Sequence, residues 1–141
     1  MTDLEIIKNL KASDIRPTNI RKEIYRIFTE AEFALSHNDL ELLTGQKYDR
    51  VTIYRTLDLL CANSIIHRVI DDSGISKYSL SKYEPPEKPE VNKHLHFKCR
   101  KCGHTYCFST IDLPEINFPA QLKVTSLDIS AKGICHNCLG I

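Results

Sequence analysis

Two Cys-x-x-Cys pairs are the most informative chemical feature of this chain. Four thiolates in two pairs of this spacing form the ligand pattern of a tetrahedral structural zinc site. Gly103 follows the first pair and can adopt the positive φ that lets the backbone turn around an ion. The competing interpretations are structural disulfides and a redox dithiol, but matched pairs in a chain without a recognisable signal peptide favour zinc. The four predicted zinc ligands are Cys99, Cys102, Cys135 and Cys138.

The composition is that of an ordinary globular protein of 141 residues, with 42% hydrophobic and 26% charged residues. The N-terminal segment is acidic and amphipathic, and no stretch reaches the length of a membrane span, so we expect a cytoplasmic protein with reduced cysteines. The net charge is only +1, so any surface for nucleic acid must be local. Two basic clusters stand out, one of Arg16, Arg21, Lys22 and Arg26 and one of Lys47, Arg50 and Arg55.

A proline-rich segment with alternating charges, residues 81–92, divides the sequence. Prolines at this density prevent regular structure and are typical of an extended linker. We therefore predict a first module over 1–80 and a second over 93–141.

The first module has the pattern of four helices followed by a hairpin. Ser36 and Asp49 are typical N-cap residues for the third and fourth helices. Segments 65–70 and 75–80 flank an Asp-Asp-Ser-Gly turn, which is typical of a β-hairpin. The residues expected to face the core are Leu4, Ile7 and Leu10, then Ile20, Ile24, Ile27 and Phe28, then Leu40 and Leu43, and finally Ile53, Leu57 and Leu60.

Helices followed by a two-stranded wing are the arrangement of a winged helix-turn-helix. In such a domain the helix before the wing, here about 49–62, enters the major groove of DNA. The alternative is a small α+β domain that binds no nucleic acid.

The second module has the pattern of three strands, over 94–98, 104–109 and 123–131, with a short irregular helix near 112–122. So small a sheet has open edges and little core. Pairing with a second copy would cover the edges, so we expect a two-fold homodimer, which suits palindromic DNA.

Four ordered segments, which span most of the chain, resemble the ferric uptake regulator family of metal-responsive repressors. The resemblance implies an α+β homodimer whose N-terminal winged helix-turn-helix domain joins a small α/β dimerisation domain with a structural four-cysteine zinc site. It also implies a metal-dependent repressor that binds palindromic operators of metal-homeostasis or peroxide-defence genes. Separately, the sequence has no Ser or Cys nucleophile motif, no HExxH and no Gly-rich phosphate loop, so we do not expect an enzyme. The segments are 16–21 (Arg-Pro-Thr-Asn-Ile-Arg), 51–57 (Val-Thr-Ile-Tyr-Arg-Thr-Leu), 94–103 (His-x-His-x-x-Cys-x-x-Cys-Gly) and 135–138 (Cys-x-x-Cys).

By this resemblance, Tyr54 and Arg55 lie on the recognition helix, and Arg16 and Arg21 lie near phosphates or the minor groove. Arginine pairs well with phosphate or guanine, and tyrosine can contact a thymine methyl group. The alternative is that Tyr54 only packs and that Arg55 is a solvated charge. The predicted DNA-binding set is Arg16, Arg21, Arg50, Thr52, Tyr54 and Arg55.

The resemblance further implies a regulatory metal site, which this chain keeps only in part. His94 and His96 match the family's His-x-His, a spacing that puts both imidazoles on one face of a strand. The family's other ligands are a histidine, a wing carboxylate and a glutamate after the first cysteine pair, and here they are replaced by Ala34, Ser79 and Cys107. The predicted regulatory ligands are therefore His94, His96 and Cys107. A further family site also lacks its ligands, because its positions hold Lys93, Leu95 and Leu127.

A thiolate in place of a carboxylate makes the regulatory site softer. Nitrogen and sulfur ligands suit Zn²⁺, or Cu⁺, better than Fe²⁺ or Mn²⁺, so we favour zinc sensing over iron and keep Fe²⁺ and Mn²⁺ as alternatives. Cys107 could instead be an ordinary packing residue. Candidates for a fourth ligand are His37, His67, Asp71, Asp72, Glu84, Glu87 and Glu90.

Two other functions compete with a metal-responsive repressor. One, within the same family, is a constitutive or a peroxide- or iron-responsive regulator. The other is a thiol-redox or metal-handling protein, which requires an exposed thiolate of low pKa, whereas a repressor keeps its four cysteines on a metal.

Overall fold

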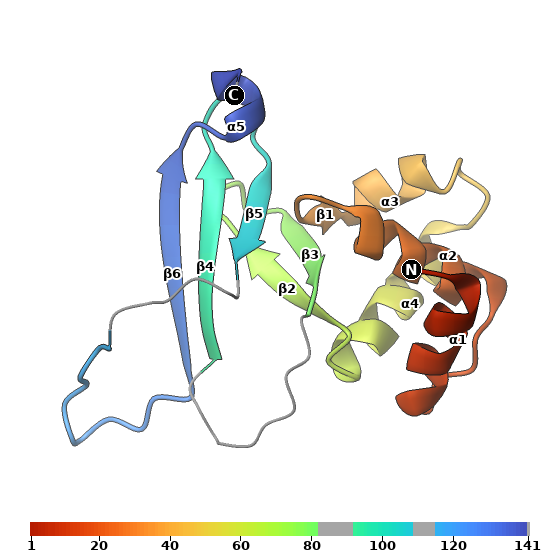
Figure 1. Ribbon diagram of the computed structural model, residues 1–141, viewed down its shortest axis with the longest axis horizontal. Helices are drawn as coiled ribbons and strands as arrows, with labels where there is room; N and C mark the ends of the chain where they lie inside the picture. Colours follow the sequence, from red (N-terminus) through yellow and green to blue (C-terminus); the bar gives the residue numbers. More distant parts are fainter. Residues whose placement is uncertain (82–91, 109–114, 141) are drawn as a thin grey trace. The chain divides into compact units, whose positions relative to one another are not determined.

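The computed structural model describes residues 1–81, 92–108 and 115–140 (Figure 1). The chain divides into two compact units, Met1–Tyr83 and Glu84–Ile141. Most of the predicted linker, residues 82–91, lies outside the described residues. Among the described residues, no helix combines the length and the apolar character that crossing a membrane requires.

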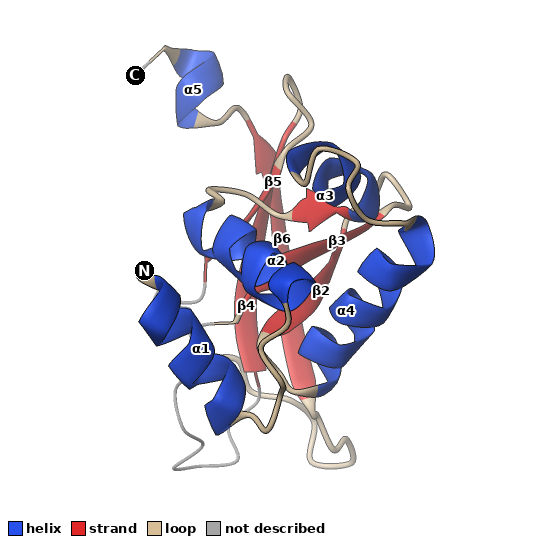
Figure 2. Cartoon of the chain, turned by 90° about the vertical axis from the view of Figure 1, so that its right-hand side faces the viewer, coloured by secondary structure: helices blue, strands red, loops and turns tan. Residues whose placement is uncertain are grey.

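The first unit contains four helices, and the predicted caps begin the third and fourth. Ser36 and Asp39 form a reciprocal capping box, and the Asp49 carboxylate accepts a hydrogen bond from the amide of Thr52 at 2.6 Å. Figure 2 shows the four helices, of which α2 contacts α1, α4 and β3, and α4 contacts α3 and β2. Their bounds are α1 Asp3–Ala12, α2 Asn19–Glu30, α3 His37–Leu43 and α4 Arg50–Ala62.

The core of this unit contains the predicted apolar faces of α2 and α4, but two leucines expected to be buried are exposed. Leu4 is 78% exposed, and Ile6 is buried in its place. Residues two apart on a helix point in nearly opposite directions, so only one of these two can face the core. Leu43 ends the short α3 and is 57% exposed, whereas the next residue, Thr44, is buried.

The predicted hairpin is present, and a third strand joins it to form an antiparallel sheet in the order β1-β3-β2. Its strands are β1 Leu35–Ser36, β2 Ile66–Ile70 and β3 Ser76–Leu80. Lys77 lies 2.9 Å from Asp71 across the turn, and both side chains are largely buried. The sequence did not predict β1, because two residues are too few to show an alternating pattern.

The second unit contains the three predicted strands in the order β5-β4-β6. They are β4 Asn92–Cys99, β5 Thr105–Phe108 and β6 Ser126–Gly133, with β4 antiparallel to β5 and parallel to β6. The predicted helix near 112–122 is wrong for its described part: residues 115–122 form no helix, and 112–114 lie outside the described residues. Pro119 falls inside this segment and cannot donate a helical hydrogen bond. A one-turn helix, α5 His136–Leu139, follows β6 and was not predicted.

Candidate metal centre and nucleic-acid surface

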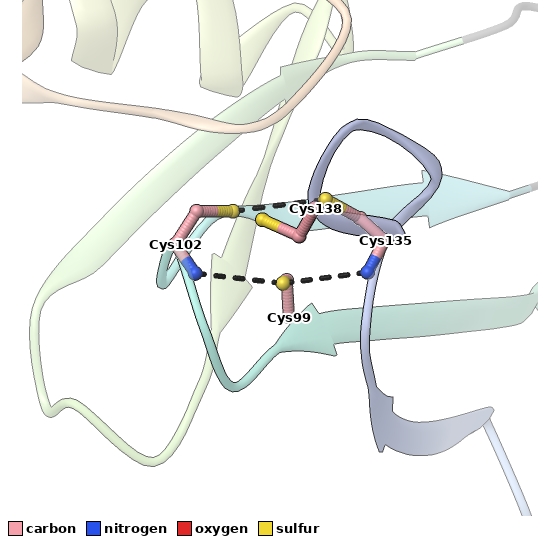
Figure 3. A group of neighbouring side chains, drawn as sticks. All are labelled: Cys99, Cys102, Cys135 and Cys138. Atoms are coloured by element: carbon pink, nitrogen blue, oxygen red, sulfur yellow. Dashed lines mark hydrogen bonds between the residues drawn. The ribbon is translucent and has the colours of Figure 1, made fainter. Parts of the chain in front are cut away.

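The fold brings the two cysteine pairs together at one end of the second unit's sheet. Cys99 ends β4 and lies opposite Gly133, the last residue of β6. Because the two strands are parallel, the segments that leave them start side by side, one carrying Cys102 and the other Cys135 and Cys138. The four sulfurs lie within 4.8 Å of one another (Figure 3). The predicted four-cysteine cluster is therefore present.

Backbone amides point at the buried sulfur of Cys99, which has no solvent exposure. The amide of Cys102 donates to it at 3.5 Å and the amide of Cys135 at 3.3 Å (Figure 3). Gly103 has φ +78°, so the predicted left-handed turn after the first pair is confirmed. Amides that donate to a sulfur stabilise its thiolate form, which is the form that binds a metal.

The cysteines differ in how readily they give up a proton. Amides donating to Cys99 lower its pKa to about 5, and the amide of Cys138 helps to lower the pKa of Cys135. The hydrogen bond with Cys135 raises the pKa of Cys138 to about 12. The amide of His104 lowers the pKa of Cys102, but desolvation and neighbouring sulfurs outweigh it, so that pKa is raised overall. Four thiolates this close repel one another, and a cation must replace the retained protons.

The spacing of the sulfurs fits a tetrahedral metal. Zn–S bonds of about 2.3 Å at tetrahedral angles place two sulfurs about 3.8 Å apart. The sulfurs of Cys102 and Cys135 lie 3.8 Å apart. A disulfide needs about 2.05 Å, and none of the four cysteines is in one. The donor set and spacing therefore match a zinc site.

The geometry disfavours a reactive redox pair. Such a pair needs a thiolate that is both exposed and of low pKa. The exposed cysteine of the cluster, Cys102, has a raised pKa, whereas Cys99, with the pKa of about 5, is fully buried. Solvent exposure and a low pKa therefore do not occur together on either Cys99 or Cys102.

Aromatic rings pack beside this cluster. The ring of Tyr106 lies 6.4 Å from that of Phe97 and 6.1 Å from that of His136, measured between centroids. Burial, together with the nearby sulfur of Cys135, raises the pKa of Tyr106 to about 12. The phenol therefore stays protonated beside the sulfurs over the physiological pH range.

Two of the three predicted regulatory ligands lie together. His96 of β4 is directly opposite Cys107 of β5, and a ring nitrogen of the former lies within 4.8 Å of the sulfur of the latter. His94 is also on β4, opposite Asp128 of β6, but its side chain lies outside what the structure describes. The structure therefore supplies one nitrogen and one sulfur donor on neighbouring strands.

The candidates for a fourth ligand have other contacts or are not described. His37 lies against Tyr54 and the carbonyl of Arg50, and Asp71 pairs with Lys77. His67 Nδ1 lies 3.3 Å from the hydroxyl of Ser81. Three further candidates, Glu84, Glu87 and Glu90, lie outside the described residues.

The solvent-facing side of α4 carries the residues predicted to bind nucleic acid. Tyr54 is 49% exposed, Arg50 and Arg55 are exposed, and Thr52 is half-buried. The opposite side of the helix is fixed in the core by its apolar residues. Such a helix can enter a groove without unfolding the domain.

The two remaining predicted DNA-binding residues lie next to each other at the start of α2. Arg16 is exposed, and the guanidinium of Arg21 donates to its backbone carbonyl at 2.9 Å. This hydrogen bond fixes the direction of the Arg21 side chain and leaves its other donors for an anion.

The comparisons with known proteins point to one family. The model of the ferric uptake regulator family matches residues 12–130. The ferric uptake regulation protein of Bacillus subtilis is 30% identical over 144 residues, covering 96% of this chain and 93% of that protein. The protein of the same name from Staphylococcus aureus is 27% identical and covers 98% of both.

Solved structures share the fold. The Helicobacter pylori ferric uptake regulator superposes with a TM-score of 0.64 at 18% identity, covering 99% of this chain and 95% of that one. A zinc uptake regulator complexed with zinc and DNA gives 0.64 at 23% identity, covering 99% and 97%. These likenesses confirm the predicted α+β fold class. Since the family model spans most of the chain and a relative is 30% identical along nearly all of it, this protein belongs to the ferric uptake regulator family of metal-responsive DNA-binding regulators.

Proposed function

We propose that this protein is a zinc-responsive transcriptional repressor of metal-homeostasis genes, which acts in the cytoplasm as a homodimer on palindromic DNA operators. The observation that carries the zinc assignment is the pairing of His96 with Cys107 on neighbouring strands. A nitrogen and a sulfur donor favour Zn²⁺ over the harder Fe²⁺ and Mn²⁺.

The four-cysteine cluster is proposed as a structural site for one Zn²⁺ per chain. Cys99 and Cys102 would tie the end of β4 to Cys135 and Cys138 around α5. The ion would supply the charge that lets all four sulfurs be thiolates at once. The amides on Cys99 and the 3.8 Å sulfur separation support this assignment.

The regulatory metal is proposed to bind His94, His96 and Cys107. A metal can strengthen DNA binding only if these ligands hold it better in the conformation that binds DNA than in the other conformation. The zinc uptake regulator that shares this fold was solved with both zinc and DNA, which is consistent with such a coupling.

DNA is proposed to bind the exposed face of α4. Tyr54, Arg50, Thr52 and Arg55 would face the major groove, with Arg16 and Arg21 on phosphates or in the adjacent minor groove. Two such helices in a homodimer would contact two half-sites, so the operator should be palindromic. The family's regulatory role supports this reading over an enzyme.

An iron-responsive regulator is the second candidate. The observation that favours it is the name of the curated relatives, which are ferric uptake regulation proteins of Bacillus subtilis and Staphylococcus aureus. The zinc and iron proposals differ in which ion restores DNA binding to protein stripped of its looser metal.

The test combines metal analysis with DNA binding on the same samples. Protein purified under reducing conditions is analysed for metal before and after mild chelation, and its binding to a duplex selected from a random-sequence pool by the untreated protein is measured. We expect two Zn²⁺ per chain, of which chelation removes one together with DNA binding, and Zn²⁺ restores the binding. Restoration by Fe²⁺ alone would establish the iron alternative instead.

A matched pair of cysteine variants checks the ligand set. Cys107→Ser should lose the chelatable metal and the metal dependence of DNA binding. Cys61→Ser serves as the control, because this half-buried thiol packs beside the core of the first unit. A single tightly held metal in the unmodified protein, with DNA binding indifferent to chelation, would refute the regulatory site and leave the cysteine cluster untouched.

A further inference from the structure

A buried histidine joins the two helices of the helix-turn-helix. His37 is the first residue of α3, and only 7% of it is exposed. Its Nε2 lies 3.0 Å from the carbonyl oxygen of Arg50, the first residue of α4. A carbonyl only accepts, so Nε2 carries the proton and donates. This hydrogen bond fixes the start of α4 relative to α3.

The same imidazole stacks on the residue proposed to read DNA. The ring centroids of His37 and Tyr54 lie 4.3 Å apart, with an angle of 27° between the ring planes. A half-exposed tyrosine on a helix surface would otherwise sample several side-chain orientations. The stack covers one face of the phenol ring and restricts these orientations, while the rest of the ring stays accessible.

A third contact brings in a basic residue of α4. Nδ1 of His37 lies 3.6 Å from a carboxylate oxygen of Glu41, and the same oxygen lies 3.5 Å from Nε of Arg50. His37 and Glu41, both on α3, thus contact Arg50 in the first turn of α4. The orientations of Tyr54 and Arg50 are both linked to the position of this one imidazole.

Packing alone does not explain a histidine here. Nδ1 of His37 is buried and has no partner within hydrogen-bond distance, since the Glu41 oxygen at 3.6 Å is too far. Burying such an atom costs free energy that an apolar side chain of similar size would not lose. A residue whose only role were to fill space would be better replaced by leucine or phenylalanine.

We propose that His37 is a positioning residue for DNA recognition, which holds Tyr54 and the first turn of α4 in the orientation that contacts the bases. This inference rests on the proposed function, in which the exposed face of α4 binds DNA. His37 itself, being buried, does not touch the DNA and acts through Tyr54.

The test is a double-mutant cycle on the intact, metal-loaded protein. The probes are a duplex selected from a random-sequence pool by the unmodified protein and a duplex of the same composition in shuffled order. His37→Ala, Tyr54→Ala and the double variant are compared, with Asn38→Ala as the control because Asn38 is the exposed neighbour on α3. His37→Phe restores the stacked ring but not the hydrogen bond, and also serves if His37→Ala does not fold.

We expect His37→Ala to weaken binding to the selected duplex by about tenfold, the size of one lost base contact, and binding to the shuffled duplex by less than about twofold. In the Tyr54→Ala background the same substitution should cost less than about threefold, because its effect passes through a side chain already removed. His37→Phe should recover part of the specific affinity.

Three results would overturn the inference while leaving the proposed function intact. These are no loss in His37→Ala, an equal loss on both duplexes, and an equal loss with and without Tyr54. If the unmodified protein selects no preferred duplex at all, the proposed function itself fails, and this inference fails with it.

Discussion

Gly133 offers a sharp test of how tightly the metal end of the second unit is packed. A methyl group added at this position would lie 3.3 Å from two atoms of the Phe97 ring, closer than an ordinary contact between carbon atoms. Gly133 is also the register partner of Cys99, and its carbonyl accepts a hydrogen bond from the amide of Arg100 at 2.8 Å. The backbone at this position is therefore held to the end of β4.

Two opposing effects set the size of the change in Gly133→Ala. Overpacking a well-filled site costs about 1–3 kcal/mol, and the half-buried Phe97 ring must shift by only a few tenths of an ångström, so we take about 1.5 kcal/mol. Replacing glycine in a strand gains about 0.5–1 kcal/mol from the lower entropy of the unfolded chain. The expected net effect is a loss of about 0.5–1 kcal/mol in the free energy of unfolding.

A companion variant reverses the sign of this effect. In Phe97→Leu the ring is absent, so the added methyl group meets no close neighbour and only the entropy gain remains. Gly133→Ala should then stabilise this variant by about 0.5 kcal/mol. The assay is urea unfolding followed by tyrosine fluorescence, with the four proteins of the cycle compared at matched metal content. An equal effect of Gly133→Ala in both backgrounds would refute the steric argument.

Two further predictions concern the first unit. Desolvation raises the pKa of the Glu23 carboxylate, but hydrogen bonds from Lys47 and Tyr48 outweigh the desolvation and lower the pKa from 4.5. The ionised carboxylate therefore stabilises the fold fully above pH 4.5, and this stabilisation is lost as the pH falls through the lower pKa of the folded state. Glu23→Gln should therefore show a smaller loss of thermal stability on acidification than the unmodified protein, and an unchanged acid profile would contradict this. Ser36→Ala removes the side-chain oxygen that accepts from the amide of Asp39 at 3.1 Å and should lower the free energy of unfolding by about 1 kcal/mol. Urea unfolding measures this loss. Ser13→Ala is the comparison and should change little, because the half-buried Ser13 follows the end of α1 and caps no helix N-terminus.

Local signals explain which parts of this fold could be predicted from the sequence. Ser36 and Asp49 cap helices through contacts with residues three positions away, so the chemistry is visible in a short window. The four-cysteine cluster was predictable because each pair forms its own tight turn and a metal needs four such donors. In both cases the residue types and their short spacing are enough to predict the local geometry.

Features that depend on distant contacts could not be predicted in this way. The strand β1 exists because Leu35 pairs with Tyr78 of β3, and two residues show no period of their own. The stack of His37 on Tyr54 joins two helices across a turn, and no local pattern signals it. The helix expected near 112–122 is a different case, because over the described part, 115–122, the signal against a helix is local: Pro119 cannot donate a helical hydrogen bond.

Strand β4 links the two proposed metal sites in one piece of chain. It carries His94 and His96 in its middle and ends at Cys99, so its register with β5 and β6 sets both sites at once. A structural metal on the cysteines would fix that register at one end and so keep His96 opposite Cys107. A metal on His96 and Cys107 would not in turn fix the cysteine cluster. The strand β5 pairs with β4 over only four residues, whereas β6 pairs with β4 over eight and leads directly to Cys135 and Cys138. We therefore expect the proposed regulatory site to depend on the cysteine cluster, and an ion that exchanges at His96 and Cys107 to leave the register of the sheet unchanged.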